Sequence, residues 1–112
     1  MTWALITDFS EAYLQPLLTN ILNQMKDDEN LVIVDNRSED ETVPIIVGLI
    51  GEDFQDEERY KFYINSHRKS KKESEEVARA VNTKEHICFI NRKKIGSKHL
   101  EKKREEILNA TI

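Results

Sequence analysis

The sequence predicts a single α/β or α+β domain over residues 1–112, with a mixed five-stranded sheet and three helices in the order β-α-β-β-β-α-β-α. The chain has 112 residues, which is the size of one domain. Short apolar runs alternate with segments of helical periodicity. Charged residues make up 34% of the chain and hydrophobic residues 38%, so a modest core lies under an ionic surface.

The first third predicts a strand, a helix and a second strand. Residues 3–7 and 31–34 are short apolar runs, and the second is apolar at every position, which is typical of a strand buried on both faces. Between them, apolar residues recur at helical spacing, and Pro16 is compatible with this helix only in its first turn. The stripe comprises Leu14, Leu17, Leu18, Ile21, Leu22 and Met25. A strand–helix–strand unit favours a right-handed parallel crossover.

The middle of the chain predicts an antiparallel hairpin. Residues 43–50 are apolar at nearly every position, with Pro44 at the start and Gly48 inside, and we interpret them as a buried strand. Residues 59–65 alternate between apolar and polar side chains, which indicates a half-exposed or edge strand. An exposed edge of this kind also allows a homodimer that forms by strand pairing.

The last third predicts a helix, a strand and a helix. Ser70 is followed three residues later by Glu73, the spacing of a capping box, and the helix continues to about residue 82. Residues 87–90 form an apolar strand, and Gly96 and Ser97 open a final helix. The segments 60–70 and 86–97 are similar to each other, because each is a strand followed by Ile-Asn, several basic residues and a serine.

Charge is distributed unevenly along the chain. Residues 1–60 carry fourteen acids and three bases, whereas residues 61–112 carry seven acids and fourteen bases. This asymmetry indicates an interaction surface or two halves that neutralise each other. The single cysteine, Cys88, excludes an internal disulfide, and no apolar run is long enough for a membrane span. We therefore expect a cytoplasmic protein without a membrane partner.

Basic residues crowd the starts of the last two predicted helices, where free backbone N–H groups already favour anions. The leading interpretation is a non-enzymatic binding or regulatory module whose surface at 67–72 and 92–98 binds nucleic acid, another polyanion or a protein partner. Neutralisation of the first turn by Glu39, Asp40 and Glu41 is the competing interpretation. The predicted anion-binding residues are His67, Arg68, Lys69, Ser70, Lys71, Arg92, Lys93, Lys94, Ser97 and Lys98.

Two other functions remain open from the residues. Asp8 and Asp35 follow two strands predicted to be parallel, and carboxylates at such ends can hold Mg²⁺ in a nuclease or phosphotransferase. The same aspartates also suit helix capping and turns, and the sequence has no standard catalytic, metal or cofactor motif. We therefore expect neither metal nor cofactor, and an enzyme is not the favoured class. The acidic first half would also suit a protein-interaction module or a mimic of nucleic acid.

The segment 63–68, Tyr-Ile-Asn-Ser-His-Arg, follows the β-α-β-β order and precedes a helix. In this respect the first eighty or so residues resemble a family of short uncharacterised proteins from lactic-acid bacteria and their relatives. The resemblance implies a small cytoplasmic bacterial protein of unassigned activity, and it draws attention to Arg68.

Overall fold

The computed structural model describes residues 1–51, 59–81, 87–90 and 99–111, and four strands alternate with four helices in this part of the chain. The strands are β1 (Thr2–Thr7), β2 (Asn30–Asp35), β3 (Tyr60–Ile64) and β4 (Ile87–Phe89). The helices are α1 (Leu14–Gln24), α2 (Thr42–Ile50), α3 (Lys71–Val81) and α4 (His99–Thr111). The structure confirms an α/β fold, but the predicted order of elements is wrong.

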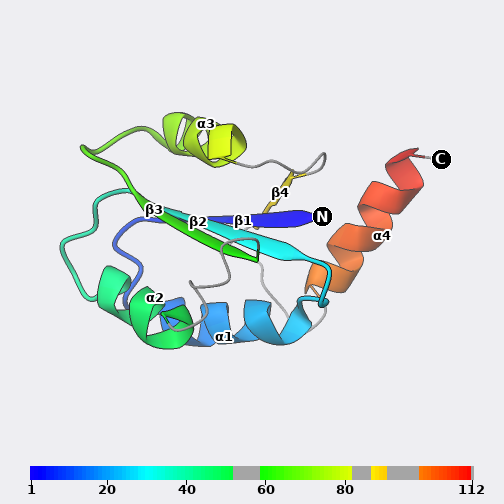
Figure 1. Ribbon diagram of the computed structural model, residues 1–112, viewed down its shortest axis with the longest axis horizontal. Coiled ribbons are helices and arrows are strands. Elements are labelled where there is room, and N and C mark those ends of the chain that lie inside the picture. The colour runs from blue at the N-terminus through cyan, green and yellow to red at the C-terminus, as the bar shows by residue number, and fades with distance from the viewer. Residues whose placement is uncertain (52–58, 82–86, 91–98, 112) are drawn as a thin grey trace.

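The strands form one sheet in the order β3-β2-β1-β4, and every neighbouring pair is parallel. The prediction of a mixed sheet with five strands and a hairpin is therefore wrong for the described residues. In the register, Thr7 lies beside Asp35, and Asp35 lies beside Ile64. Three consecutive strands of this sheet thus end at the same edge, which brings their following loops together (Figure 1).

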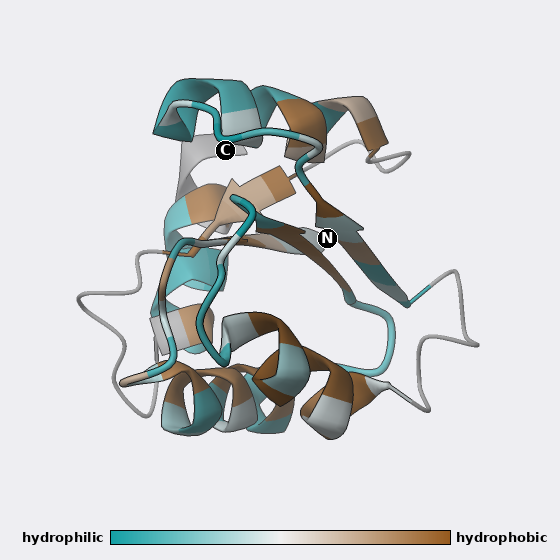
Figure 2. Ribbon diagram, turned by 90° about the vertical axis from the view of Figure 1, so that its left-hand side faces the viewer, coloured by the Kyte–Doolittle hydropathy of each residue, from teal (hydrophilic) through white to brown (hydrophobic). Residues whose placement is uncertain are grey.

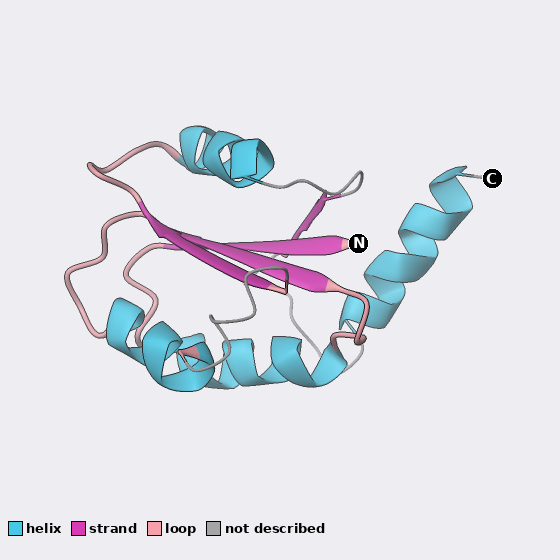
Figure 3. Ribbon diagram, viewed as in Figure 1, coloured by secondary structure: helices cyan, strands magenta, loops and turns pink. Residues whose placement is uncertain are grey.

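Helices cover both faces of the sheet, with α1 and α2 on one side and α3 on the other (Figure 3). The larger core lies between the sheet and α1 and α2, and it includes Trp3, Leu18 and Ile33. The smaller core, around Ala4, Val34 and Ala78, lies under α3. Figure 2 shows hydrophobic residues along the strands and on the lower helices, whereas much of α3 is hydrophilic.

The main error of the sequence prediction falls on residues 43–50, which form helix α2 instead of a strand. Thr42, Ile46 and Ile50 are buried at a spacing of four residues, which keeps them on one face of a helix. Val47 is apolar but exposed on the outer side, so the continuous apolar run hid the helical pattern. Pro44 lies in the first turn of α2, where its missing N–H costs no helical hydrogen bond.

Two predictions for the neighbouring helices are confirmed, namely the place of Pro16 in α1 and the capping box of α3. Helix α1 begins at Leu14, so Pro16 lies in its first turn, as expected. At the start of α3, the Ser70 N–H donates to the Glu73 carboxylate and the Glu73 N–H donates to Ser70 Oγ, each at 3.1 Å. This reciprocal pair is the predicted capping box.

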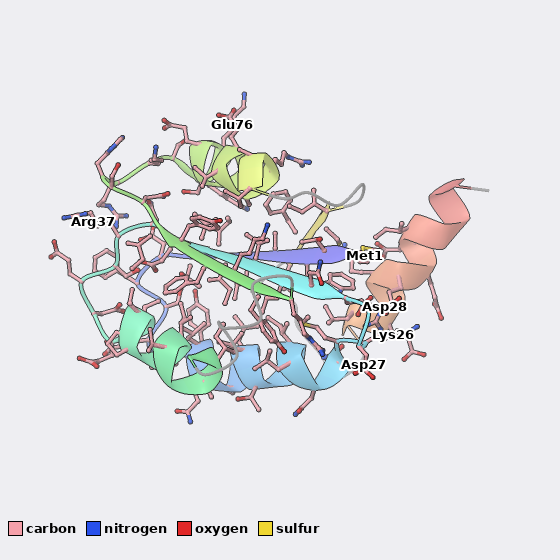
Figure 4. The ribbon with its side chains drawn as sticks, viewed as in Figure 1. Met1, Lys26, Asp27, Asp28, Arg37 and Glu76 are labelled. Atoms are coloured by element: carbon pink, nitrogen blue, oxygen red, sulfur yellow. The ribbon has the colours of Figure 1, made fainter. Side chains whose placement is uncertain are left out.

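Helix α4 is anchored at the end of the sheet away from the shared loop edge. Arg104 donates to the Glu29 carboxylate at 2.7 Å from Nε and to the Gln24 carbonyl at 2.6 Å, and its guanidinium lies 5.5 Å from the Trp3 ring. Figure 4 shows Lys26, Asp27 and Asp28 at this end and Arg37 at the opposite end. The α4 anchor is therefore well separated from the loops that follow the strands.

Candidate functional site

The candidate site is the edge of the sheet where β1, β2 and β3 end. In open parallel sheets, ligands bind outside the carboxyl ends of the strands, because the loops there converge without closing over the edge. In this chain, three loops meet at that edge, over residues 8–13, 36–41 and 65–70. Hydrogen bonds between these loops, which are distant in sequence, define their arrangement.

Asp35 organises the first two loops from below. Its side chain is buried and accepts hydrogen bonds from the hydroxyl groups of Thr7 and Ser38 and from the Ser38 N–H, each at 2.7 Å. Three donors compensate the cost of burying this carboxylate. Asp35 therefore fixes the loop that follows β2. Its hydroxyl partners occupy the positions around the carboxylate at which a metal ion would bind.

Asp8 lies beside Asp35 at the strand ends, as predicted, but it faces a cation. Its Oδ2 accepts a hydrogen bond from Arg68 at 3.0 Å and another from the Asn36 amide at 3.3 Å. Its Oδ1 is buried and has no hydrogen-bond partner among the described residues. The described residues contain no group of three or more His, Cys, Asp or Glu side chains that could hold a metal ion.

Phe9 is the most unusual residue of the edge, and the sequence analysis missed it. Its φ angle is 48°, in the left-handed region that an aromatic residue seldom adopts, and 49% of its surface is exposed. Its N–H donates to Ser38 Oγ at 2.9 Å, while the neighbouring Ser10 N–H donates to Thr42 Oγ1 at 2.7 Å. These bonds hold the backbone of Phe9 in a strained conformation while its ring stays exposed. Strained backbone of this kind is typical of functional sites.

Arg68 lies over one face of this ring. Its guanidinium lies 5.1 Å from the centre of the Phe9 ring, a distance suited to a cation–π contact. It donates to Asp8 at 3.0 Å and to the Asn36 carbonyl at 3.1 Å. The hydrogen bond to Asp8 is the main reason why the pKa of Arg68 is raised above its ordinary value. The sequence singled out Arg68, and the carboxylate to which Arg68 donates is that of Asp8 and not one of the loop at 39–41.

A buried amide network supports this arrangement. Asn36 Oδ1 accepts from the Lys69 N–H at 2.8 Å and from the Asn65 amide at 3.1 Å, while Asn36 Nδ2 donates to the Lys69 carbonyl at 2.8 Å. The Asn65 amide also donates to Ser74 Oγ at 3.0 Å. The network joins the ends of β2 and β3 to α3, and the sequence analysis assigned no role to either asparagine.

The rest of the predicted basic turn is open to solvent. His67 and Lys71 are exposed and Lys69 is partly exposed, whereas Ser70 is engaged in the capping box of α3. Arg37 is also exposed, and its guanidinium donates to the Ser66 carbonyl at 3.0 Å. The predicted residues of the second turn lie outside the described part of the chain. They are Arg92, Lys93, Lys94, Ser97 and Lys98.

An open parallel sheet, flanked by helices and with its loops gathered at the carboxyl ends, defines a doubly wound α/β domain, a class of fold in which ligands bind at that edge. The family model of glycosyl transferase family 2 matches residues 4–83, and the chain belongs to this family. No curated protein sequence matches the chain. The matched range contains most of β1, the whole of β2, β3 and α1 to α3, and all three loops of the candidate site.

Solved structures show the same fold. The chain is similar to S. aureus TarS residues 1–349, with a TM-score of 0.72 and 20% identity over 96% of this chain and 32% of that one. It is also similar to the same TarS fragment in complex with UDP-GlcNAc, with a TM-score of 0.70 and 21% identity over 96% of this chain and 31% of that one. The chain thus spans about a third of the length of these structures.

These comparisons correct four predictions. The chain does not belong to the uncharacterised family of lactic-acid bacteria, since the glycosyl transferase model covers most of its length. The interpretation as a non-enzymatic binding module is wrong, because the family is one of sugar-transferring enzymes. The nuclease or phosphotransferase and the acidic mimic are wrong for the same reason, and nothing supports a nucleic-acid partner.

Within the described residues, no helix has the length and apolar character needed to cross a membrane.

Proposed function

We propose that this chain is the part of a glycosyltransferase that binds the nucleotide sugar, and that its ligand is a uridine diphosphate sugar such as UDP-GlcNAc. Family membership supports a sugar-transferring enzyme. The complex of TarS with UDP-GlcNAc suggests the class of donor. The conformation of Phe9 is the main support for placing the ligand at this edge of the sheet. Its strained backbone costs stability, and its exposed aromatic ring presents a flat surface to a ligand.

The nucleotide base would stack on Phe9 at the edge of the sheet. Base–aromatic stacking contributes about 1–3 kcal/mol per base, enough to orient a nucleotide. Arg68 supplies hydrogen-bond donors beside the ring, and Asp8, whose side chain is 31% exposed, supplies a carboxylate. This pairing of one flat surface with a few polar groups is typical of small-ligand sites.

The diphosphate would lie along the basic turn. Lys69 lies on the same turn as Arg68 and His67, and Lys71 begins α3 directly after it; none of the described hydrogen bonds or ion pairs involves the ammonium group of either lysine. Cationic groups placed there favour binding of the diphosphate and stabilise the negative charge on the leaving group as the bond from the sugar to the phosphate breaks. The second turn, at 92–98, remains a prediction from the sequence for the same role.

We also propose that residues 1–112 form one domain and act in the cytoplasm, since Cys88 is a free thiol and the chain has no second cysteine. β3 is the last strand of the described sheet on its side, and Tyr63 and Ile64 are 39% and 51% exposed. A homodimer through this edge stays a prediction.

Calorimetric titration with UDP-GlcNAc tests the proposal. We expect the wild-type chain to bind and Phe9→Ala to weaken binding about tenfold, in line with the loss of one base stack. Val47→Ala is the matched control, because Val47 is also apolar and 49% exposed but lies on the outer side of α2. Equal affinities for Phe9→Ala and wild type would rule out the placement of the base, and no binding by wild type would rule out the proposed function.

A further inference from the structure

The outer side of helices α1 and α2 carries no charge. Residues 12–25 and 42–51 contain no Asp, Glu, Lys or Arg, although these four residue types make up 34% of the chain. The two ranges include all of α1 and α2, which pack against each other on one face of the sheet (Figure 3). Helix α3, on the other face, has charged residues on its exposed side, among them Lys71, Glu76 and Arg79. The absence of charge is therefore a property of one side of the domain.

The exposed residues of α1 and α2 define this uncharged face. Those of α1 are Gln15, Pro16, Thr19 and Asn23, and those of α2 are Pro44, Val47 and Gly48. Exposed charged residues lie beyond the helix ends, at Glu11, Glu41, Lys26, Asp27 and Asp28, and the last three are labelled in Figure 4. A centre that is depleted of charge, inside a polar rim, is the anatomy of a protein–protein interface.

Gly48 is the member of this face that its own chain does not explain. Glycine destabilises the interior of a helix relative to alanine, because it loses more conformational freedom on folding. Its φ angle is not positive, and a Cβ atom at Gly48 would meet no atom of the described chain within 4 Å. At Gly51, by contrast, a Cβ atom would collide with the Val47 carbonyl. An exposed helical glycine of this kind allows the backbone of another molecule to approach closely.

The uncharged face is suited to contact with a copy of itself. In a two-fold dimer the same patch lies on both subunits, so a charge near its centre would meet a like charge, and this face has none. Val47 is 49% exposed and adjacent to Gly48, so the valine of each copy can fill the space beside the glycine of the other. A lipid surface fits less well, because helices that lie on membranes present Lys, Arg and large aromatic residues.

We propose that the uncharged face is a dimer interface, in which α2 crosses α2 of a second copy of this chain at Gly48. The inference goes beyond the proposed function and does not depend on nucleotide binding. With 11 and 9 residues, α1 and α2 are about 16 and 13 Å long and together about 20 Å wide. The outline of the face is thus roughly 300 Å², whereas a standard interface buries roughly 800 Å² per partner. Even with the relief of its side chains, a face of this size supports a weak and reversible dimer.

Sedimentation velocity of the wild-type chain over a range of protein concentrations tests the inference. We expect a dissociation constant on the order of 100 μM, as for the small interfaces of transient complexes. Gly48→Glu should raise this constant at least about tenfold, because two like charges would meet at the crossing of the helices. Ala80→Glu is the matched control, since it adds the same charge on the exposed side of α3 and should leave the constant unchanged.

Gly48→Ala separates close approach from loss of folding. It should raise the urea midpoint of the monomer, because alanine is the better helix former, and yet weaken the dimer several-fold. Ile64→Glu distinguishes this face from the exposed edge of β3, and it should leave the dimer intact. The inference is overturned by a wild-type chain that stays monomeric up to about 1 mM, a concentration that detects even very weak association. It is also overturned by a dimer that neither Gly48 variant weakens, or by one that only Ile64→Glu disrupts.

Discussion

Glu29 provides a sharp test of how α4 is held to the sheet. Burial alone would raise the pKa of Glu29, but hydrogen bonds from Arg104 and from the Lys26 N–H outweigh it and lower the pKa from 4.5 to about 2. At about 1.36 kcal/mol per unit, this shift corresponds to about 3 kcal/mol of stability at neutral pH. Because the folded pKa is depressed, the contribution is complete above about pH 5 and is lost as pH falls toward 2.

The perturbation is Glu29→Gln, and the assay is urea unfolding at several values of pH. Wild type should be more stable by about 3 kcal/mol at pH 7, and the difference should fall to about 1.4 kcal/mol at pH 3. Glu106→Gln is the control, because Glu106 is 66% exposed and its ion pair with Lys103 contributes at most about 1 kcal/mol. A difference between wild type and Glu29→Gln that stays constant between pH 7 and pH 3 would refute the reasoning.

Three further predictions test the elements around the site by urea unfolding. Ile46→Ala should cost about 2–5 kcal/mol and Val47→Ala less than about 0.5 kcal/mol, because only Ile46 lies on the buried side of α2; similar costs would contradict that helix. Ser70→Ala should cost about 1 kcal/mol by removing the capping box with Glu73, and an unchanged stability would contradict its role. Phe9→Gly should be more stable than Phe9→Ala by about 0.5–1 kcal/mol, since glycine adopts the positive φ without strain; the reverse order would argue against strain at this position.

The elements that the sequence predicted correctly are those with a local signal. The leucine stripe of α1 and the capping box at Ser70 depend on residues within one or two helical turns, and the structure confirms both. α2 was misassigned because the buried Ile46 and the exposed Val47 are both apolar, so periodicity could not separate the faces. A wrong strand there also led to the wrong hairpin, and hence to a mixed sheet.

The site was predictable only in part, because local sequence signals mark some of its residues and distant contacts define the others. The positions of Asp8 and Asp35 after predicted strands and the basic composition around Arg68 drew attention to these residues. The sequence thus indicated three of the residues that meet at the edge. The strained backbone of Phe9 and the bonds between Asn36 and the turn after β3 depend on contacts about thirty or more residues apart in the chain. A single sequence carries no periodic signal for such contacts, whereas the aromatic residue between the first strand and the first helix is visible in the sequence.

NMR titration of the ¹⁵N-labelled chain with UDP-GlcNAc tests the central claim most directly. The account predicts chemical-shift changes at the carboxyl edge of the sheet, in the loops at 8–13, 36–41 and 65–70, with little change in α4. Shifts confined to α4 or to the opposite end of the sheet, or an unchanged spectrum at millimolar UDP-GlcNAc, would contradict it.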